Sequence, residues 1–209
     1  QLSTMTTILL LIRHGRTAYN AAKRWQGHLD VPLDDVGQEQ AQALAARLAD
    51  WPGTAVYSSD LLRARMTAVP LAAAWNVTPI YEADWRERHV GVFEGRAAEE
   101  LQADYPDVFA KMRQGVIDIP GGERHESLQA RAAAAFQRVL ARHPDEMVAI
   151  VSHGGTLNAL VSHVLDIPHQ YGRLSFHGNT GLTILRVSHG IPRLTMLNDT
   201  RHLGDGIPT

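Results

Sequence analysis

The chain contains no cysteine, so disulfides, thiolate metal sites and a cysteine nucleophile are all excluded. Long apolar runs are also absent: the longest one near the N-terminus, residues 8–12, is too short for the core of a signal peptide or for a membrane span. Charge of one sign does not accumulate, because 20 lysine and arginine residues and 22 acidic residues are spread along the chain. We therefore expect a cytoplasmic protein that binds neither nucleic acid nor membranes.

Hydrophobic residues make up 44% of the 209 residues, which is enough apolar material for one continuous core. The sequence shows no internal repeat, low-complexity tract or linker-like shift in composition. We therefore expect a single domain over residues 1–209. Because the sequence begins with glutamine, we interpret residues 1–4 as a cloning remnant or an alternative-start extension, and Met5 as the native start.

Short β-prone runs alternate with longer stretches of helical periodicity. Strands are expected at residues 8–12, 54–58, 78–81 and 147–151, and helices at 35–50, 61–75, 127–142 and 157–165. Two final β-prone runs, residues 181–187 and 193–197, predict a hairpin. Pro70 predicts a kink or an early end in the second helix. The alternation of strands and helices favours an α/β layer fold with a mostly parallel sheet.

Residues 96–124 are more polar than their surroundings and are interrupted by proline and glycine. The segment predicts one or two short helices that act as a lid or side wall of a binding site and decide its substrate specificity. Four of its residues are candidates for the wall of that site: Tyr105, Phe109, Met112 and Arg113.

Four histidines in the chain precede glycine, and two of them follow directly on a predicted buried strand. These two are His14 and His153. Ligands of open α/β sheets bind beyond the carboxyl ends of the strands, so both histidines are candidates for chemistry. His177 is expected in a loop near the mouth of the site, and His189 in the hairpin without a functional role.

The residues around His14 suit a phosphate group. Arg13 and Arg16 flank the His14–Gly15 pair, and Thr17 and Asn20 follow within one loop. Guanidinium groups bind a dianionic phosphate by charge-assisted hydrogen bonds, and backbone N–H groups complete its coordination. Arg63, near the start of a helix that follows a strand, could face the same edge of the sheet or be an ordinary solvated arginine.

Six motifs in one order resemble the histidine phosphatase superfamily, also called the phosphoglycerate mutase-like family. The matching stretches are Leu11-Ile12-Arg13-His14-Gly15-Arg16-Thr17 with Asn20; Gln26-Gly27 with Asp30, Pro32, Leu33 and Gly37; Ser58-Ser59-Asp60-Leu61 with Arg63-Ala64 and Thr67; Arg86-Glu87-Arg88 with Gly91, Glu94 and Gly95; Pro120-Gly121-Gly122-Glu123; and Val151-Ser152-His153-Gly154-Gly155 with Asn179. The similarity extends from about residue 8 to 200 and implies a three-layer α/β/α fold.

The resemblance implies a role for each matching residue. His14 would be the nucleophile that accepts the phosphoryl group, and Arg13, Arg63 and His153 would surround its oxygens. Glu87 would protonate the leaving alcohol and then take a proton from water; the competing interpretation is a salt bridge from Glu87 to a neighbouring arginine. The residues expected to assist phosphate or substrate binding are Gly15, Thr17, Asn20, Gln26, Gly27 and Gly154. No metal and no cofactor is needed, because arginines supply the positive charge.

Other functions remain open at this stage. A cofactor-dependent phosphoglycerate mutase would use the same nucleophile, and the pair Arg88–His89 after Glu87 looks mutase-like. Mutases, however, carry a longer insertion between the acid and the Pro-Gly-Gly motif, whereas here only residues 87–122 span this distance. A non-catalytic binding module would have lost catalytic residues, and none is lost. A zinc helix at His125–Glu126 fails because Gln129 stands where the second histidine is required. The expected partner is a small phosphate ester, with candidates among sugar phosphates, phosphoglycerate derivatives and α-ribazole phosphate; the resemblance is also compatible with a homodimer.

Overall fold

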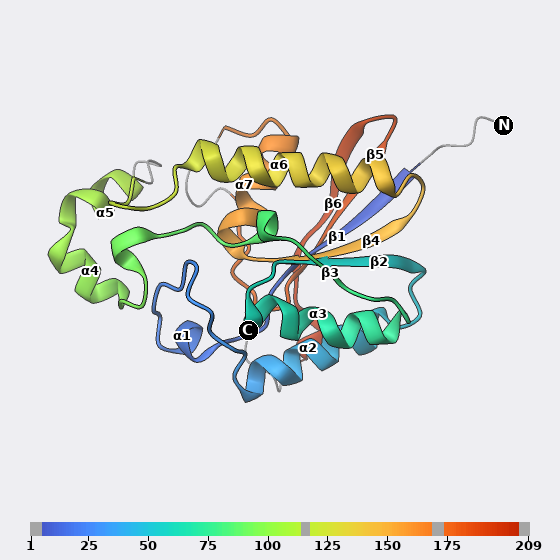
Figure 1. The fold of residues 1–209 in the computed structure, drawn as a ribbon, viewed down its shortest axis with the longest axis horizontal. Coiled ribbons are helices and arrows are strands. Elements are labelled where there is room, and N and C mark those ends of the chain that lie inside the picture. The colour runs from blue at the N-terminus through green and yellow to red at the C-terminus, as the bar shows by residue number, and fades with distance from the viewer. Residues whose placement is uncertain (1–5, 114–117, 169–173, 205–209) are drawn as a thin grey trace.

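The computed structural model describes residues 6–113, 118–168 and 174–204 (Figure 1). Its centre is a six-stranded sheet with the strand order β3-β2-β4-β1-β5-β6. Strands β1, β2, β3 and β4 pair in parallel, whereas β5 and β6 form the expected hairpin and pair antiparallel with β1 and with each other. The sheet is therefore mostly parallel, as the sequence predicts. Residues 1–4 and the side chain of Arg113 lie outside the described part of the chain.

The strands are β1 (Thr6–Arg13), β2 (Gly53–Ser58), β3 (Ile80–Tyr81), β4 (Met147–Ser152), β5 (Leu182–Ser188) and β6 (Ile191–Asp199). The helices are α1 (Ala18–Ala21), α2 (Asp35–Leu48), α3 (Leu62–Ala74), α4 (Ala98–Asp104), α5 (Pro106–Arg113), α6 (His125–Arg142) and α7 (Gly154–Val164). Short 3-10 turns lie at Ala83–Trp85, Gly91–Phe93 and Arg201–Leu203.

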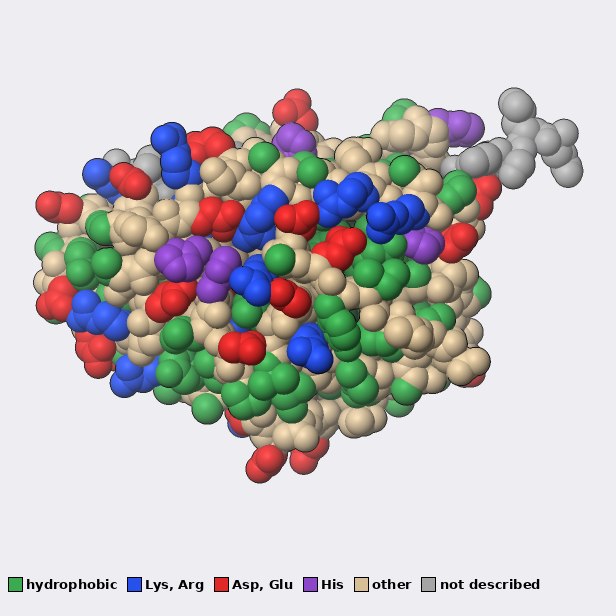
Figure 2. Space-filling model, viewed as in Figure 1, with side chains coloured by type: hydrophobic (Ala, Val, Ile, Leu, Met, Phe, Trp, Pro, Cys, Tyr) green, Lys and Arg blue, Asp and Glu red, His purple; other side chains and the backbone are tan. Residues whose placement is uncertain are grey.

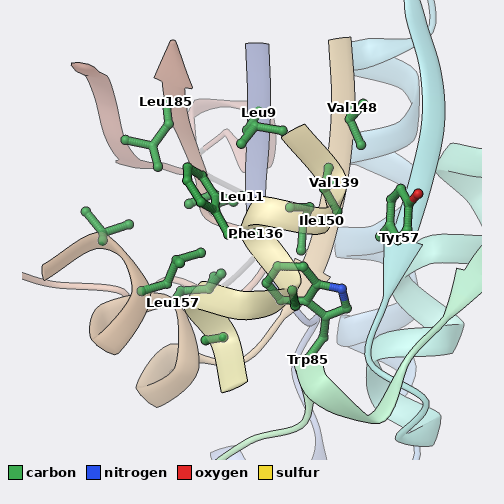
Figure 3. Packing of buried hydrophobic residues seen from close by; sticks show 14 of the residues in the cluster. Leu9, Leu11, Tyr57, Trp85, Phe136, Val139, Val148, Ile150, Leu157 and Leu185 are labelled. Atoms are coloured by element: carbon green, nitrogen blue, oxygen red, sulfur yellow. The ribbon is translucent and has the colours of Figure 1, made fainter. Parts of the chain in front are cut away.

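Side chains alternate along β1 between two apolar clusters, one on each face of the sheet. Leu9 and Leu11 pack with α6, α7 and Trp85, as Figure 3 shows. Leu10 and Ile12 pack with α2 and α3 on the opposite face. Both faces are buried, which explains why β1 is a continuous aliphatic run. The result is the three-layer α/β/α arrangement that the resemblance implies.

Two helices differ from their sequence-based prediction. Of the two outcomes that Pro70 predicts, a kink or an early end, the early end is wrong, because helix α3 continues to Ala74. Proline costs about 3 kcal/mol inside a helix, and burial of Leu71 and Ala72 in the second apolar cluster offsets this cost. Helix α7 begins at Gly154, three residues earlier than expected, so that its first turn adjoins His153. Helix α1, a single turn, has no periodic pattern from which it could have been predicted.

The described part of the lid segment contains two short helices, α4 and α5, as predicted. Its aromatic side chains form a small apolar cluster of their own with Phe93 and Trp25. Tyr105, Phe109 and Met112, the described candidates for the wall of the site, belong to this cluster and are not among the described residues that line the main cavity. The physical reason is burial: a segment this far from the sheet needs its own core to hold two helices. None of the described helices is both long and apolar enough to cross a membrane.

We predict that Phe136→Ala lowers the free energy of unfolding by about 3–5 kcal/mol, because the ring is 2% exposed in the α6 cluster and its loss leaves a cavity. Urea denaturation measures this change. Val69→Ala on α3, at a side chain that is 51% exposed, is the control and should change the free energy by less than about 0.5 kcal/mol. Equal small changes in both variants would contradict the core that the structure shows.

Candidate active site

The two strand-end histidines lie side by side because β1 and β4 are neighbours. Arg13 pairs with Ser152 at the end of the parallel ladder. The His14 backbone N–H then donates to the Ser152 carbonyl at 2.9 Å. The rings of His14 and His153 come directly after these positions, with centroids 5.1 Å apart and planes inclined at 56°.

The imidazole of His14 is held in one tautomer. Its Nδ1 lies 2.7 Å from the Gly15 carbonyl, and since a carbonyl only accepts, Nδ1 carries the proton and Nε2 keeps its lone pair. Burial lowers the pKa of His14 well below 6.5, and the charges of Arg63 and Arg13 lower it further. His14 is therefore a neutral imidazole with a free nitrogen at neutral pH.

The second histidine is buried with unused hydrogen-bonding capacity. Among the described residues, neither ring nitrogen of His153 has a hydrogen-bond partner. Burial lowers the pKa of His153 well below 6.5, with Arg63, His14 and Arg13 adding to the effect. Since buried polar atoms are normally paired, the open nitrogens of His153 indicate a place for a ligand atom.

Two arginines stand beside the histidines, Arg63 buried and Arg13 half-buried. Arg63 is 0% exposed, and its Nη1 and Nη2 donate to the carbonyls of Leu29 and Gly27 at 2.7 and 2.8 Å. Gly27 has a φ of 51°, a left-handed conformation that favours glycine. Arg13 donates to the His177 carbonyl. In both guanidinium groups Nε is buried and, within the described chain, without a partner.

Burial is the main reason for the lowered pKa of both arginines, and for Arg63 the value is about 10. Both therefore keep their charge at neutral pH. Two cations whose buried Nε atoms lack partners in the described chain are costly unless an anion joins them. Together with the open nitrogens of His153, they create a site for the oxygens of an anion.

Glu87 is bound at the N-terminus of α7. Its Oε2 accepts from the Gly155 backbone N–H at 3.1 Å, and its Oε1 accepts from its neighbour's N–H, that of Arg88, at 2.8 Å. The predicted alternative, a salt bridge to an adjacent arginine, is not formed among the described residues. Arg86 pairs with Asp60 instead, and Arg88 Nε donates to the carbonyl of Glu123.

A cavity of about 470 Å³ joins these groups. Eight of the eleven predicted site residues line it: Arg13, His14, Asn20, Gln26, Gly27, Arg63, Glu87 and Gly154. His125 and His177 also line it, so His177 lies at the site as expected. A phosphate group occupies only part of this volume, and the remainder can hold the organic part of an ester.

Three predicted residues do not line the cavity. His153 lies next to the site, because its ring is in contact with the ring of His14. The Gly15 N–H donates to the Thr67 hydroxyl at 2.9 Å, so this N–H is not available to a phosphate. Thr17 is the N-cap of α1, and its hydroxyl bonds with Asn20 and Gln26. Gly15 and Thr17 therefore shape the loop that carries the site.

Several cavity residues were not predicted as site residues. They are Lys23, Arg24, Trp25, Arg88, Val90, Leu128, Gly155, Asn158, Leu174 and Phe176, of which Arg88 and Gly155 lie within the matching motifs. They come from the segment after α1, from the Glu87 loop, and from α6, α7 and the segment after α7. Periodicity could have found only those on the regular helices, since the others depend on how irregular segments fold back over the sheet.

Among the described residues, no group of three or more histidine, aspartate and glutamate side chains is arranged to hold a metal ion. Positive charge at the cavity comes from arginine and lysine side chains, and Glu87 is the one acidic residue that the described chain places in its wall. Guanidinium charges, neutral imidazoles and an acid on one cavity form a site for phosphate esters. The fold and this site define the class: a protein that acts on phosphate esters.

Comparison with known proteins gives the family. The model of the histidine phosphatase superfamily (branch 1) matches residues 9–200, and the chain belongs to this family. It is 34% identical to phosphoglycerate mutase-like protein 4 of Arabidopsis thaliana, over 87% of this chain and 80% of that protein. It is 38% identical to the metal-independent phosphoserine phosphatase of the same plant, over 74% and 67% of the two chains.

A solved structure supports the same grouping. The mycobacterial glucosyl-3-phosphoglycerate phosphatase superposes with a TM-score of 0.85 and 33% sequence identity, covering 91% of this chain and 98% of that one. The likeness therefore extends over nearly the whole molecule.

We predict that the buried neutral histidines make the fold sensitive to mild acid. The unfolded chain protonates its histidines near pH 6.5, whereas the lowered pKa values of His14 and His153 keep the folded state unprotonated. Their contribution is complete above pH 6.5 and is lost as the pH falls from 6.5 toward the folded-state pKa. Between about pH 7.5 and about pH 5.5, His153→Asn should therefore lose about 1 kcal/mol less unfolding free energy than the wild type.

Urea denaturation at the two pH values measures the difference. His163→Asn is the matched control, because His163 is exposed on the same helix. It should lose as much stability as the wild type. An identical loss in wild type and His153→Asn would show that His153 is protonated in the folded protein.

Proposed function

We propose that the protein is a metal-independent phosphomonoesterase that hydrolyses small phosphate esters through a phosphohistidine on His14. The observation that carries the proposal is the state of His14: a neutral imidazole with Nδ1 bound to the Gly15 carbonyl. Nε2 is then the nucleophile without any prior proton transfer. Arg13, Arg63 and His153 surround the phosphoryl oxygens.

In the first step, Nε2 of His14 attacks phosphorus and the bond from phosphorus to the ester oxygen breaks. The leaving oxygen takes a proton from the Glu87 carboxyl group. The imidazole gains positive charge as the new P–N bond forms, and the Gly15 carbonyl at Nδ1 stabilises that charge. The two guanidinium groups balance the charge on the equatorial oxygens, which is the main demand of phosphoryl transfer.

In the second step, water attacks the phosphorus of phosphohistidine from the side that the alcohol has left. The Glu87 carboxylate takes the proton from this water, the P–N bond breaks, and inorganic phosphate leaves. The Gly155 N–H at Oε2 supports the carboxylate form during this step, since a helix N-terminus favours negative charge. His14 and Glu87 return to their starting states.

The substrate class is inferred from the rest of the cavity. Lys23 and Arg24 add positive charge at its wall, and Trp25 and Phe176 add aromatic surface. The phosphoserine phosphatase and the glucosyl-3-phosphoglycerate phosphatase act, by their names, on small organic phosphates that also carry a carboxylate. We propose that the substrate is a phosphate monoester of this size, with phosphoserine and phosphoglycerate derivatives as the first candidates.

A phosphoglycerate mutase is the second candidate function, since a mutase-like protein is among the relatives. A mutase must retain a doubly phosphorylated intermediate, and basic side chains of the lid would serve this purpose. Of the basic residues Arg88, Arg96 and Lys111 in that region, only Arg88 lines the cavity, and Arg96 pairs with Asp104. This arrangement favours hydrolysis.

We predict that the purified protein, with EDTA present, releases inorganic phosphate from phosphoserine and from 3-phosphoglycerate. 3-Phosphoglycerate primed with 2,3-bisphosphoglycerate should yield little 2-phosphoglycerate. His14→Ala should lower phosphate release by at least about 10³-fold, because the covalent route is lost. Rapid isomerisation without phosphate release would make the protein a mutase. Comparable turnover by His14→Ala would exclude His14 as the nucleophile. Inhibition by EDTA would indicate a metal mechanism.

We predict that Glu87→Gln slows the phosphorylation of His14 by phosphoserine about 10²- to 10⁴-fold, because a glutamine cannot protonate the alkoxide. The first turnover of p-nitrophenyl phosphate should change far less, since p-nitrophenolate leaves without a proton. Rapid-quench measurement of the first turnover separates this step from the later hydrolysis. An equal loss on both substrates would argue against the acid role.

A further inference from the structure

The loop that carries Glu87 has few backbone hydrogen bonds of its own beyond the 3-10 turn Ala83–Trp85. Its carbonyl oxygens are bound by side chains. Ser152 donates to the Trp85 carbonyl at 2.8 Å, and Thr156 donates to the Arg86 carbonyl at 2.7 Å. Such a loop holds its shape only as long as these side chains hold it.

One side chain outside the cavity wall makes most of these contacts. Arg131, on α6, donates through Nη1 to the carbonyls of Asp84 and Arg86, both at 2.8 Å. Through Nη2 it donates to the carbonyl of Glu87 at 2.9 Å. The two remaining donors bind the Glu123 carboxylate, from Nε to Oε1 at 2.8 Å and from Nη2 to Oε2 at 2.9 Å. All five N–H groups of a guanidinium are thus used.

We propose that Arg131, oriented by Glu123, is a positioning residue that sets where the Glu87 carboxyl group lies. The inference rests on the proposed acid and base role of Glu87. Arg131 fixes three carbonyls of one short loop, and the Glu87 carboxylate at the end of that loop meets the N-terminus of α7. Glu123 belongs to the Pro-Gly-Gly-Glu motif, and its role in this site is to hold the guanidinium by a two-point ion pair.

The Glu87 carboxylate, at the end of the loop, is closely packed against its neighbours. A Cβ atom at Gly155 would lie 2.5 Å from Oε1 of Glu87, so the carboxylate lies directly against the first turn of α7. His28 Nε2 is 2.7 Å from the same Glu87 carbonyl that Arg131 binds. Without Arg131 these carbonyls lose most of their donors, and the carboxylate moves relative to His14. Displacement of a catalytic group by about 1 Å can cost about 10²-fold in rate.

Figure 2 shows acidic and basic side chains interspersed in a strip between α6 and α3. Arg138 provides a matched control in this region, because it lies two turns after Arg131 on the same helix and binds the same loop. It contacts the loop through carboxylates and not through carbonyls: its Nη2 is 2.6 Å from Asp84 and 3.5 Å from Glu82. Removing Arg138 therefore removes a charge pair without freeing the backbone of Glu87.

The test compares Arg131→Met, Glu123→Gln and Arg138→Met with the wild type. For each, rapid quench gives the first turnover with phosphoserine and with p-nitrophenyl phosphate, and thermal unfolding monitors the fold. We expect Arg131→Met to slow the phosphoserine reaction about 10- to 100-fold, with a change below about 3-fold for p-nitrophenyl phosphate. Glu123→Gln should also slow the phosphoserine reaction selectively, by about 3- to 10-fold. This variant replaces Arg131→Met in the test if Arg131→Met does not fold. Arg138→Met should show no selectivity.

A double-mutant cycle with Glu87→Gln decides how Arg131 acts. In the Glu87→Gln background, Arg131→Met should cause less than about 3-fold further loss, because the group it positions is already gone. Equal losses on both substrates, or losses that multiply in the double variant, would overturn the inference and leave Arg131 a stabilising residue. If Glu87→Gln alone shows no dependence on the leaving group, the acid role of Glu87 fails first, and the positioning role fails with it.

Discussion

The parallel pairing of β1 with β4 is the contact on which the site depends. It brings Arg13 opposite Ser152, and the next residue of each strand, His14 and His153, emerges at the same carboxyl edge of the sheet. Both strands are buried on both faces, so a slip in register would cost the packing of α6 and α2 at once. The core thereby fixes the distance between two imidazoles more firmly than any loop could.

Burial determines the chemistry of these imidazoles. In water a histidine is partly protonated near neutral pH, but here desolvation and two neighbouring guanidinium charges hold the pKa of both rings well below 6.5. The same burial leaves Arg13 and Arg63 as charged groups whose Nε atoms find no partner within the described chain. A dianion relieves both conditions, because it compensates the cations and accepts from the open donors. The positive charges and open donors of the site therefore favour the binding of a phosphoryl group.

Buried strands and ordered motifs are the features that sequence reasoning predicted correctly. The aliphatic runs that end in His14 and His153 located the edge of the sheet, and the arginine and glutamate motifs located the other main groups. The same reasoning failed where tertiary packing decides. Pro70 did not end α3, because residues beyond it are buried. Tyr105 and Phe109 turned into the lid's own cluster, since local pattern shows that an aromatic will be buried but not against which neighbours.

The proposed nucleophile and the proposed acid are positioned by different means, and this difference has consequences. His14 stands at the end of a core strand, whereas Glu87 stands on a loop whose carbonyls are held by side chains from α6, β4 and α7. Variation in α4 and α5 is therefore not expected to move either group, because these helices pack on their own cluster. A change in α6 acts differently. On the proposed roles, it would reach Glu87 through Arg131 and alter proton transfer, while the groups at the ends of β1 and β4 stay in place.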